Sequence, residues 1–163
     1  MNKRRAAHPP RAQSAEGAAS PAALDAQITG ALRAQGLRIT PDRLAIWHEL
    51  YAAHDHMDAD ELYARLRSKG LKGSRATVYR TLDLYVKAEM VSKIRATEQR
   101  FVYEIAIGRK HHDHLVCTQC GRIIEFVNAD IERLQEEIAS HHGFELSAHF
   151  MRLSGRCPKC RGK

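Results

Sequence analysis

The sequence contains no run that approaches the roughly 20 consecutive apolar residues of a membrane-spanning helix. Its basic first residues, MNKRR, are followed by AAHPPRAQS and so lack the apolar core of a secretory signal. These absences predict a cytoplasmic protein without a membrane partner. Cysteine is also scarce, with four residues in the whole chain. Because reducing cytosol keeps thiols free, these cysteines are predicted to bind metal rather than to form disulfides.

The chain is short and basic. Its 163 residues, of which 44% are hydrophobic, can bury one or two modest cores. The formal charge of +7 points to a polyanionic partner such as nucleic acid. Charge alone does not decide the function, because many basic proteins bind nothing acidic.

The first part of the chain shows helical periodicity. Residues 1–22 have no apolar period and are rich in Ala, Pro, Arg and Ser, which predicts a disordered basic tail. A first helix is predicted to end at Gly36. Three further helices are each predicted to begin at a residue that can cap a helix N-terminus, namely Thr40, Asp58 and Ser74. In the last of these helices the predicted buried stripe is Val78, Leu82 and Tyr85.

Strand patterns follow the helices. Two β-rich runs joined by a short polar turn, residues 90–95 and 100–105, predict a hairpin. Helices followed by a hairpin indicate a winged-helix domain over residues 23–106. Further strands are predicted at 111–117, 122–127 and 144–153, with a helix over 128–142. We therefore predict an α+β protein with a second, smaller α/β domain.

The turn before the fourth helix is strongly basic. Between Leu62 and Leu82 the chain has no acidic residue and six basic ones, which are Arg65, Arg67, Lys69, Lys72, Arg75 and Arg80. The helix N-terminus at Ser74 adds N–H donors for a phosphate, and Thr77, Tyr79 and Arg80 could then reach base edges in a major groove. The alternative interpretation is a solvated basic helix on an ordinary domain.

Two CxxC pairs form the most specific motif. Cys117 and Cys120 are followed by Gly121, which permits a turn of positive φ, and Cys157 and Cys160 repeat the spacing. Four thiolates favour a closed, tetrahedral structural zinc site. Such a site contributes about 10 kcal/mol or more to folding. The alternative is two unrelated pairs of buried or redox cysteines.

The run HHDH precedes the first CxxC pair. On a strand, the two-residue period sends His112 and His114 to one face, and His111 and Asp113 to the other, so one run can serve two sites. Further nitrogen and oxygen ligands are available in the rest of the chain, at Glu125, Glu132, His149, Glu104 and His56. Sites of this kind suit Fe(II), Mn(II), Ni(II) or Zn(II).

The sequence resembles the ferric uptake regulator family from about Leu24 to Cys160. The matching segments are GLRITPDR, HMDADELY, RATVYRTLDLY, HHDHLVCTQCGRIIEF and CPKC. The resemblance implies a winged helix joined by a hinge, residues 107–110, to an α/β dimerisation domain, residues 111–163. It also implies a homodimer that binds AT-rich palindromic operators when metal closes the hinge, with no small-molecule substrate.

The resemblance further implies the residues of each site. The regulatory hinge site would be His56, Glu104, His112, His114 and Glu125. The second site would be His111, Asp113, Glu132 and His149. Tyr79 and Arg80 would read bases beside Arg75 and Thr77, while Arg38 would approach a minor groove. The loop from Glu104 to His111 is about one residue longer than in close relatives.

The hinge ligands bear on which metal is sensed. Peroxide-sensing relatives favour aspartate where this chain has Glu104 and Glu125, and zinc-sensing relatives place a cysteine in the sensory site. We therefore expect Fe(II) as corepressor, with zinc-, manganese- or peroxide-responsive regulation as the alternative. A metallohydrolase is disfavoured because no HExxH-like motif is present and five candidate ligands leave no open position. A zinc-ribbon interaction module would leave HHDH unexplained.

Overall fold

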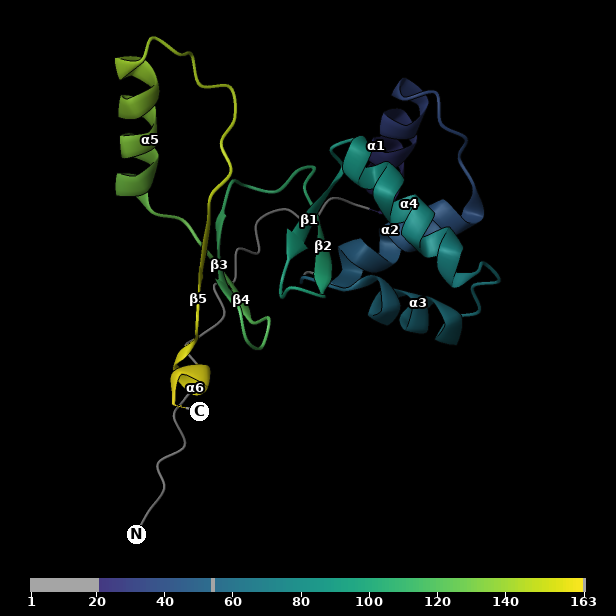
Figure 1. Cartoon of the computed structure of the whole chain (residues 1–163). Helices are drawn as coiled ribbons and strands as arrows, with labels where there is room; N and C mark the ends of the chain where they lie inside the picture. Colours follow the sequence, from purple (N-terminus) through teal and green to yellow (C-terminus); the bar gives the residue numbers. More distant parts are fainter. Residues whose placement is uncertain (1–20, 54, 163) are drawn as a thin grey trace.

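The computed structural model describes residues 21–53 and 55–162. Figure 1 shows two halves joined by a short crossing segment. The first half contains α1 (Pro21–Ala34), α2 (Pro41–Ala53), α3 (Ala59–Ser68), α4 (Arg75–Lys87), β1 (Val91–Arg95) and β2 (Phe101–Ile105). The second half contains β3 (Asp113–Cys117), β4 (Ile123–Phe126), α5 (Ala129–His141), β5 (Arg152–Gly155) and α6 (Pro158–Arg161).

The predicted helix starts are confirmed by their caps. The Thr40 hydroxyl accepts a hydrogen bond from the Arg43 backbone N–H at 3.3 Å. Asp58 accepts from the Glu61 backbone N–H at 2.8 Å, and Ser74 does the same for Thr77 at 3.2 Å. Each cap satisfies a backbone donor that has no partner inside its helix. Short polar side chains therefore fix where α2, α3 and α4 begin.

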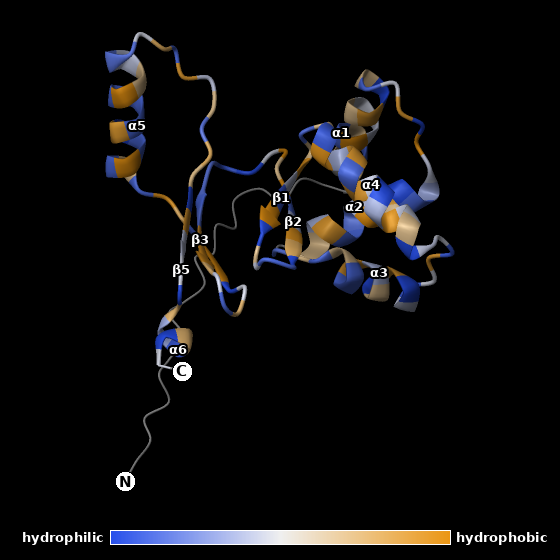
Figure 2. Ribbon diagram, in the orientation of Figure 1, coloured by the Kyte–Doolittle hydropathy of each residue, from blue (hydrophilic) through white to orange (hydrophobic). Residues whose placement is uncertain are grey.

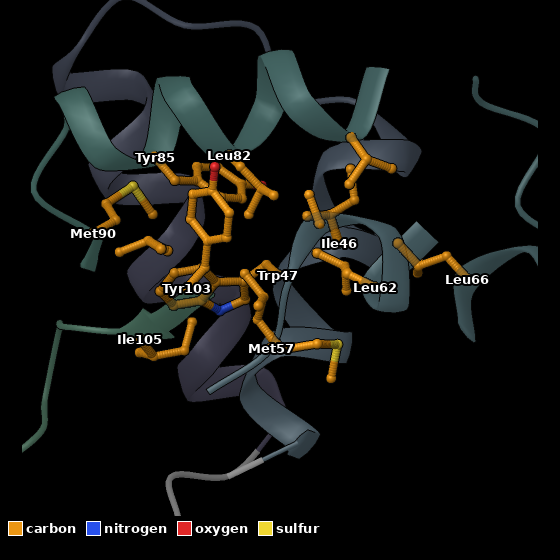
Figure 3. Packing of buried hydrophobic residues seen from close by; sticks show 14 of the residues in the cluster. Ile46, Trp47, Met57, Leu62, Leu66, Leu82, Tyr85, Met90, Tyr103 and Ile105 are labelled. Carbon is orange, nitrogen blue, oxygen red and sulfur yellow. The ribbon is translucent and has the colours of Figure 1, made fainter. Parts of the chain in front are cut away.

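The core of the first half lies between the helices and the hairpin (Figure 3). The predicted stripe of Val78, Leu82 and Tyr85 on α4 is fully buried. The Tyr85 ring meets Trp47 edge to face, with centroids 5.8 Å apart, and its hydroxyl donates to the Arg43 carbonyl at 2.7 Å. These contacts fix α4 against α2.

One backbone contact brings the loop before α3 to the hairpin. Met57 and Tyr103 exchange two backbone hydrogen bonds, of 3.1 and 2.8 Å, so the loop pairs with β2 as an isolated bridge. Both side chains are buried in the core of the first half. This pairing places His56 beside Glu104.

The second half is a three-stranded sheet in the order β4-β3-β5, with β4 antiparallel and β5 parallel to β3. The register sets Leu115 beside both Ile124 and Leu153, and each of these side chains is more than 40% exposed. Helix α5 has no buried residue among those described, and Figure 2 shows that the helix stands apart from the helices of the first half. An apolar surface therefore remains on this half of a single chain.

The predicted strand over 144–153 is wrong in extent. The strand is Arg152–Gly155, and residues 144–151 form no strand. The apolar alternation of Phe144, Leu146 and Phe150 suggested a strand, but this segment pairs with no strand in the described part of the chain. The short helix α6 was not predicted.

The predicted boundaries differ slightly from the elements. Strand β3 begins at Asp113 rather than at His111, because residues 106–112 cross from one half to the other. Helix α1 begins at Pro21, two residues before the predicted start of the winged-helix domain. Residues 1–20 of the predicted tail lie outside the described residues. None of the described helices is long and apolar enough to cross a membrane.

Candidate metal centres

The four cysteines meet at one end of the second half. Their sulfur atoms all lie within 4.8 Å of one another, and Cys120 Sγ is 3.9 Å from Cys157 Sγ. Thiolates around a tetrahedral zinc at ~2.3 Å are about 3.8 Å apart, whereas a disulfide requires about 2.05 Å. The cysteine geometry fits zinc, and all four thiols are free.

Local backbone geometry prepares the cysteine cluster. Gly121 has φ +70°, as the turn after the first CxxC pair requires, and its N–H donates to the Cys117 carbonyl at 2.9 Å. Backbone N–H groups of Cys120 and Cys157 lower the pKa of the Cys117 thiol to about 6. Contact with the Cys157 side chain and burial raise the pKa of Cys160 to about 12. One thiol is therefore readily ionised, while a cation would have to displace the proton of the other.

A second cluster lies at the start of β3. It brings together His111, Asp113, Glu132 and His149, whose ligand atoms all fall within 4.8 Å. The Nε2 atoms of His111 and His149 are 2.7 Å apart, and Glu132 approaches them at 3.2 and 3.0 Å. Among the described residues, buried Asp113 has two carboxylate oxygens without a hydrogen-bond partner. Such orphaned oxygens beside two imidazoles fit a cation.

A third cluster lies between the two halves. The five residues proposed for the hinge site form two overlapping groups that share Glu104, rather than a single set. The two groups are His56, Glu104 and His114, and Glu104, His112 and Glu125. Glu104 Oε2 is 3.2 Å from Nε2 of both His56 and His112, and Glu104 Oε1 is 3.2 Å from Nε2 of His114.

Glu104 is the electrostatic centre of this hinge cluster. Burial acts to raise the pKa of its carboxyl, but contacts with three imidazoles outweigh burial and hold the pKa far below its usual range. In turn, the carboxylate of Glu104 raises the pKa of His112. A carboxylate that is 4% exposed needs a positive partner, because an isolated buried charge is costly.

The imidazoles of the hinge cluster are not aligned as hydrogen-bond partners of one another. Within the described part of the chain, His56 Nε2 and both ring nitrogens of His114 are buried without an aligned hydrogen bond. The Nε2 atoms of His56 and His114 nevertheless each lie 3.2 Å from a carboxylate oxygen of Glu104. Nitrogen and oxygen atoms that lie this close together without hydrogen-bond geometry are placed as ligands of a shared cation would be. The mixed nitrogen and oxygen set suits a divalent transition metal.

Sequence reasoning missed Arg109 in this cluster. Its guanidinium lies 3.1 Å from both Glu104 Oε2 and Glu125 Oε2. The signal in the sequence was the basic pair that precedes HHDH.

The predicted DNA contacts are spread over the surface of the first half. Arg38, Arg75, Tyr79 and Arg80 are exposed, whereas the Thr77 side chain is half-buried and its hydroxyl lies 3.1 Å from that of Ser74 in the cap of α4. Sequence reasoning also missed Asp60 on α3. This carboxylate binds both Arg75 and the Tyr79 hydroxyl.

The sequence pattern of the ferric uptake regulator family matches residues 34–154. The chain belongs to the ferric uptake regulator family. Members of this family are dimeric DNA-binding transcriptional regulators that respond to metal, not enzymes. The combination of a winged helix with a cysteine cluster agrees with this assignment.

Individual relatives align over most of this chain. The ferric uptake regulation protein of Campylobacter jejuni is 42% identical over 134 residues, which cover 81% of this chain and 85% of that protein. The solved regulator of Helicobacter pylori, described as having three functional metal-binding sites, gives a TM-score of 0.76 at 28% identity and covers 88% of this chain and 95% of its own. The Pseudomonas aeruginosa regulator, solved with manganese, gives a TM-score of 0.71 at 36% identity. This match covers 80% of this chain and 97% of that one.

Proposed function

We propose that this family member is an Fe(II)-dependent repressor of metal-acquisition genes, with the hinge cluster as its sensing site. The observation that supports the proposal is that the cluster takes ligand atoms from both halves. His56 and Glu104 come from the winged-helix half, while His112, His114 and Glu125 come from β4 and the segment that leads into and through β3. The cysteine cluster would hold structural zinc.

The chemistry follows from this placement. A cation that is bound by both halves stabilises only those arrangements that bring all its ligands together. Metal would therefore shift the population toward one orientation of α4 relative to the second half. The bound cation supplies positive charge at Glu104, which this chain otherwise provides with imidazoles and Arg109.

The partner in this proposal is an AT-rich palindromic operator. The N-terminus of α4 and the basic turn before it would approach phosphates, with Tyr79 and Arg80 at base edges. Arg38, on the loop before α2, would enter a minor groove. All three side chains are exposed, as contact with DNA requires.

The homodimer would form through the second half. The row of Leu115, Ile124 and Leu153 is apolar and exposed, and Leu134 and Ile138 add exposed apolar side chains on α5. Exposed apolar patches of this kind mark association surfaces. A two-fold dimer would present two α4 helices, which matches a palindromic site.

The donor set does not by itself name the metal. Nitrogen and oxygen ligands bind Zn(II) at least as tightly as Fe(II), so metal availability decides. The hinge cluster contains no cysteine, and relatives solved with iron, from Francisella tularensis, and with manganese share this fold. Iron as the corepressor agrees with both observations.

The test is an anaerobic gel-retardation assay of zinc-loaded protein on an AT-rich palindrome, with and without Fe(II) or Mn(II), at fixed salt. The wild-type protein should shift the DNA only with added metal. His112→Ala should abolish this dependence and keep its zinc, while His141→Ala, on α5 outside the three clusters, should behave as wild type. Metal-dependent binding that survives in His112→Ala would overturn the assignment of the hinge cluster.

A further inference from the structure

Arg109 lies in the segment that crosses between the two halves. Gly108, with φ +74°, makes the turn immediately before it, and the Arg109 backbone N–H reaches the Ala106 carbonyl at 3.5 Å. The guanidinium then bridges two carboxylates, with one nitrogen 3.1 Å from Glu104 Oε2 and another 3.1 and 3.3 Å from the two oxygens of Glu125. Glu104 belongs to β2 and Glu125 to β4. Arg109 therefore ties the two halves together.

The oxygens that Arg109 holds belong to the candidate metal ligands. Glu104 Oε2 is also the oxygen nearest to His56 Nε2 and His112 Nε2. A carboxylate oxygen has two lone pairs, and Glu104 Oε2 already faces two imidazoles and the guanidinium. A divalent ion that takes this oxygen therefore competes with Arg109 for lone pairs and repels its positive charge, which weakens the contacts of Arg109. The two cations are alternatives at the same two carboxylates.

The side chain has the properties that such an exchange needs. An arginine stays charged at any pH relevant to the cell and matches carboxylates with a planar fork, so it neutralises Glu104 and Glu125 well. About a third of the Arg109 side chain is exposed, whereas Glu104 is 4% exposed. Arg109 can therefore move into solvent while the carboxylate stays in place.

We propose that Arg109 is a built-in competitor of the divalent cation at the hinge cluster. It holds the two halves together through Glu104 and Glu125 in metal-free protein, and it lowers the apparent metal affinity because binding must displace it. The proposal rests on the hinge cluster being a metal site.

The test compares Mn(II) binding by zinc-loaded Arg109→Gln, wild type, Lys110→Gln and His112→Ala, with free Mn(II) measured by electron paramagnetic resonance. Hinge binding is defined as the part that His112→Ala loses. Arg109→Gln should bind Mn(II) at the hinge about 5- to 50-fold more tightly than wild type. Lys110→Gln removes the same charge one residue away and should stay within about twofold. Arg109→Lys keeps the positive charge but lacks the planar guanidinium, so its Mn(II) affinity at the hinge should lie between those of wild type and Arg109→Gln.

A second measurement tests the bridge that Arg109 makes in the metal-free protein. Amide hydrogen exchange over residues 104–114 and along β4 should be faster in metal-free Arg109→Gln than in wild type, because the bridge between the halves is lost. Equal Mn(II) affinity of Arg109→Gln and wild type, with hinge binding lost in His112→Ala, would overturn the role of Arg109 and leave the sensing site intact. Equal affinity in all five proteins would overturn both proposals.

Discussion

The guanidinium of Arg75, at the start of α4, binds both carboxylate oxygens of Asp60 on α3. Its Nε donates to Oδ1 at 2.6 Å, a terminal nitrogen donates to Oδ2, and the Tyr79 hydroxyl donates to Oδ1 at 3.1 Å. The contact with Asp60 raises the pKa of Arg75 further above its already high value. A carboxylate thus occupies the fork that would otherwise bind a DNA phosphate, and it orients two of the proposed DNA contacts.

We expect Asp60→Asn to increase non-specific DNA affinity and to reduce discrimination between operator and random DNA. Freeing Arg75 for one more phosphate should make the slope of log Kobs against log salt more negative by about 0.9. Binding would be measured by fluorescence anisotropy at several salt concentrations. Glu137→Gln removes the same charge from a pair with Arg133 on α5, in the second half, and serves as control. An unchanged salt slope in Asp60→Asn would show that the pair does not compete with phosphate.

Tyr85→Phe should destabilise the first half in a pH-dependent way. The lost hydroxyl donates to the Arg43 carbonyl at 2.7 Å. The free energy of unfolding of the variant should therefore be about 1 kcal/mol lower than that of the wild type at neutral pH. Burial raises the pKa of Tyr85 above its ordinary value of 10.0. The stabilisation that it provides is therefore complete below about pH 10, the pKa in the unfolded chain, and is lost as the pH rises toward the higher folded value. The difference in free energy of unfolding between wild type and variant, measured by urea denaturation, should become smaller above about pH 10. A difference that stays constant with pH would contradict this prediction.

Much of the fold could be predicted because it is encoded by local spacing. Ser74, the buried stripe of α4 and Gly121 each act within a few residues of their own positions, so a sequence pattern identifies them. Contacts between distant segments could not be found in this way. Arg109 and Asp60 are ordinary surface charges in the sequence. Their partners Glu125 and Arg75 lie 16 and 15 residues away along the chain, and only the fold brings each pair into contact. The strand prediction over 144–151 was wrong for the same reason, because alternation alone does not provide the pairing with another strand that a strand requires.

Cys117→Ser should remove zinc and unfold the second half. The pKa of this thiol is lowered, and its sulfur accepts a hydrogen bond from the Cys157 backbone N–H at 3.3 Å, so it ties the two CxxC turns together. The measurements are zinc content by mass spectrometry and near-UV circular dichroism, with Ser154→Ala on β5 as the folded control. Full zinc retention with unchanged melting would contradict the assignment of the cysteine cluster.

Leu153→Asp should convert the dimer into monomers. The side chain lies beside Leu115, which in turn lies beside Ile124, so a carboxylate there would be desolvated in an apolar contact. Sedimentation equilibrium measures the result. Ser154→Asp places the same charge on the other face of β5 and should leave the dimer intact. Dimers that persist in Leu153→Asp would place the interface elsewhere.

The cluster of His111, Asp113, Glu132 and His149 shares no residue with the hinge cluster, although the two meet in the run HHDH. Their ligands lie on opposite faces of β3 and of the residues leading into it, so each cluster should bind metal without the other. We expect zinc-loaded wild type to bind two Mn(II) ions per chain, and His149→Ala and His56→Ala to bind one each. His149→Ala should retain metal-dependent DNA binding, because the bridge between the halves is intact, while His56→Ala should lose it. If His149→Ala also lost metal-dependent DNA binding while retaining hinge Mn(II), the second cluster would have to act on DNA binding through the dimer rather than through the hinge.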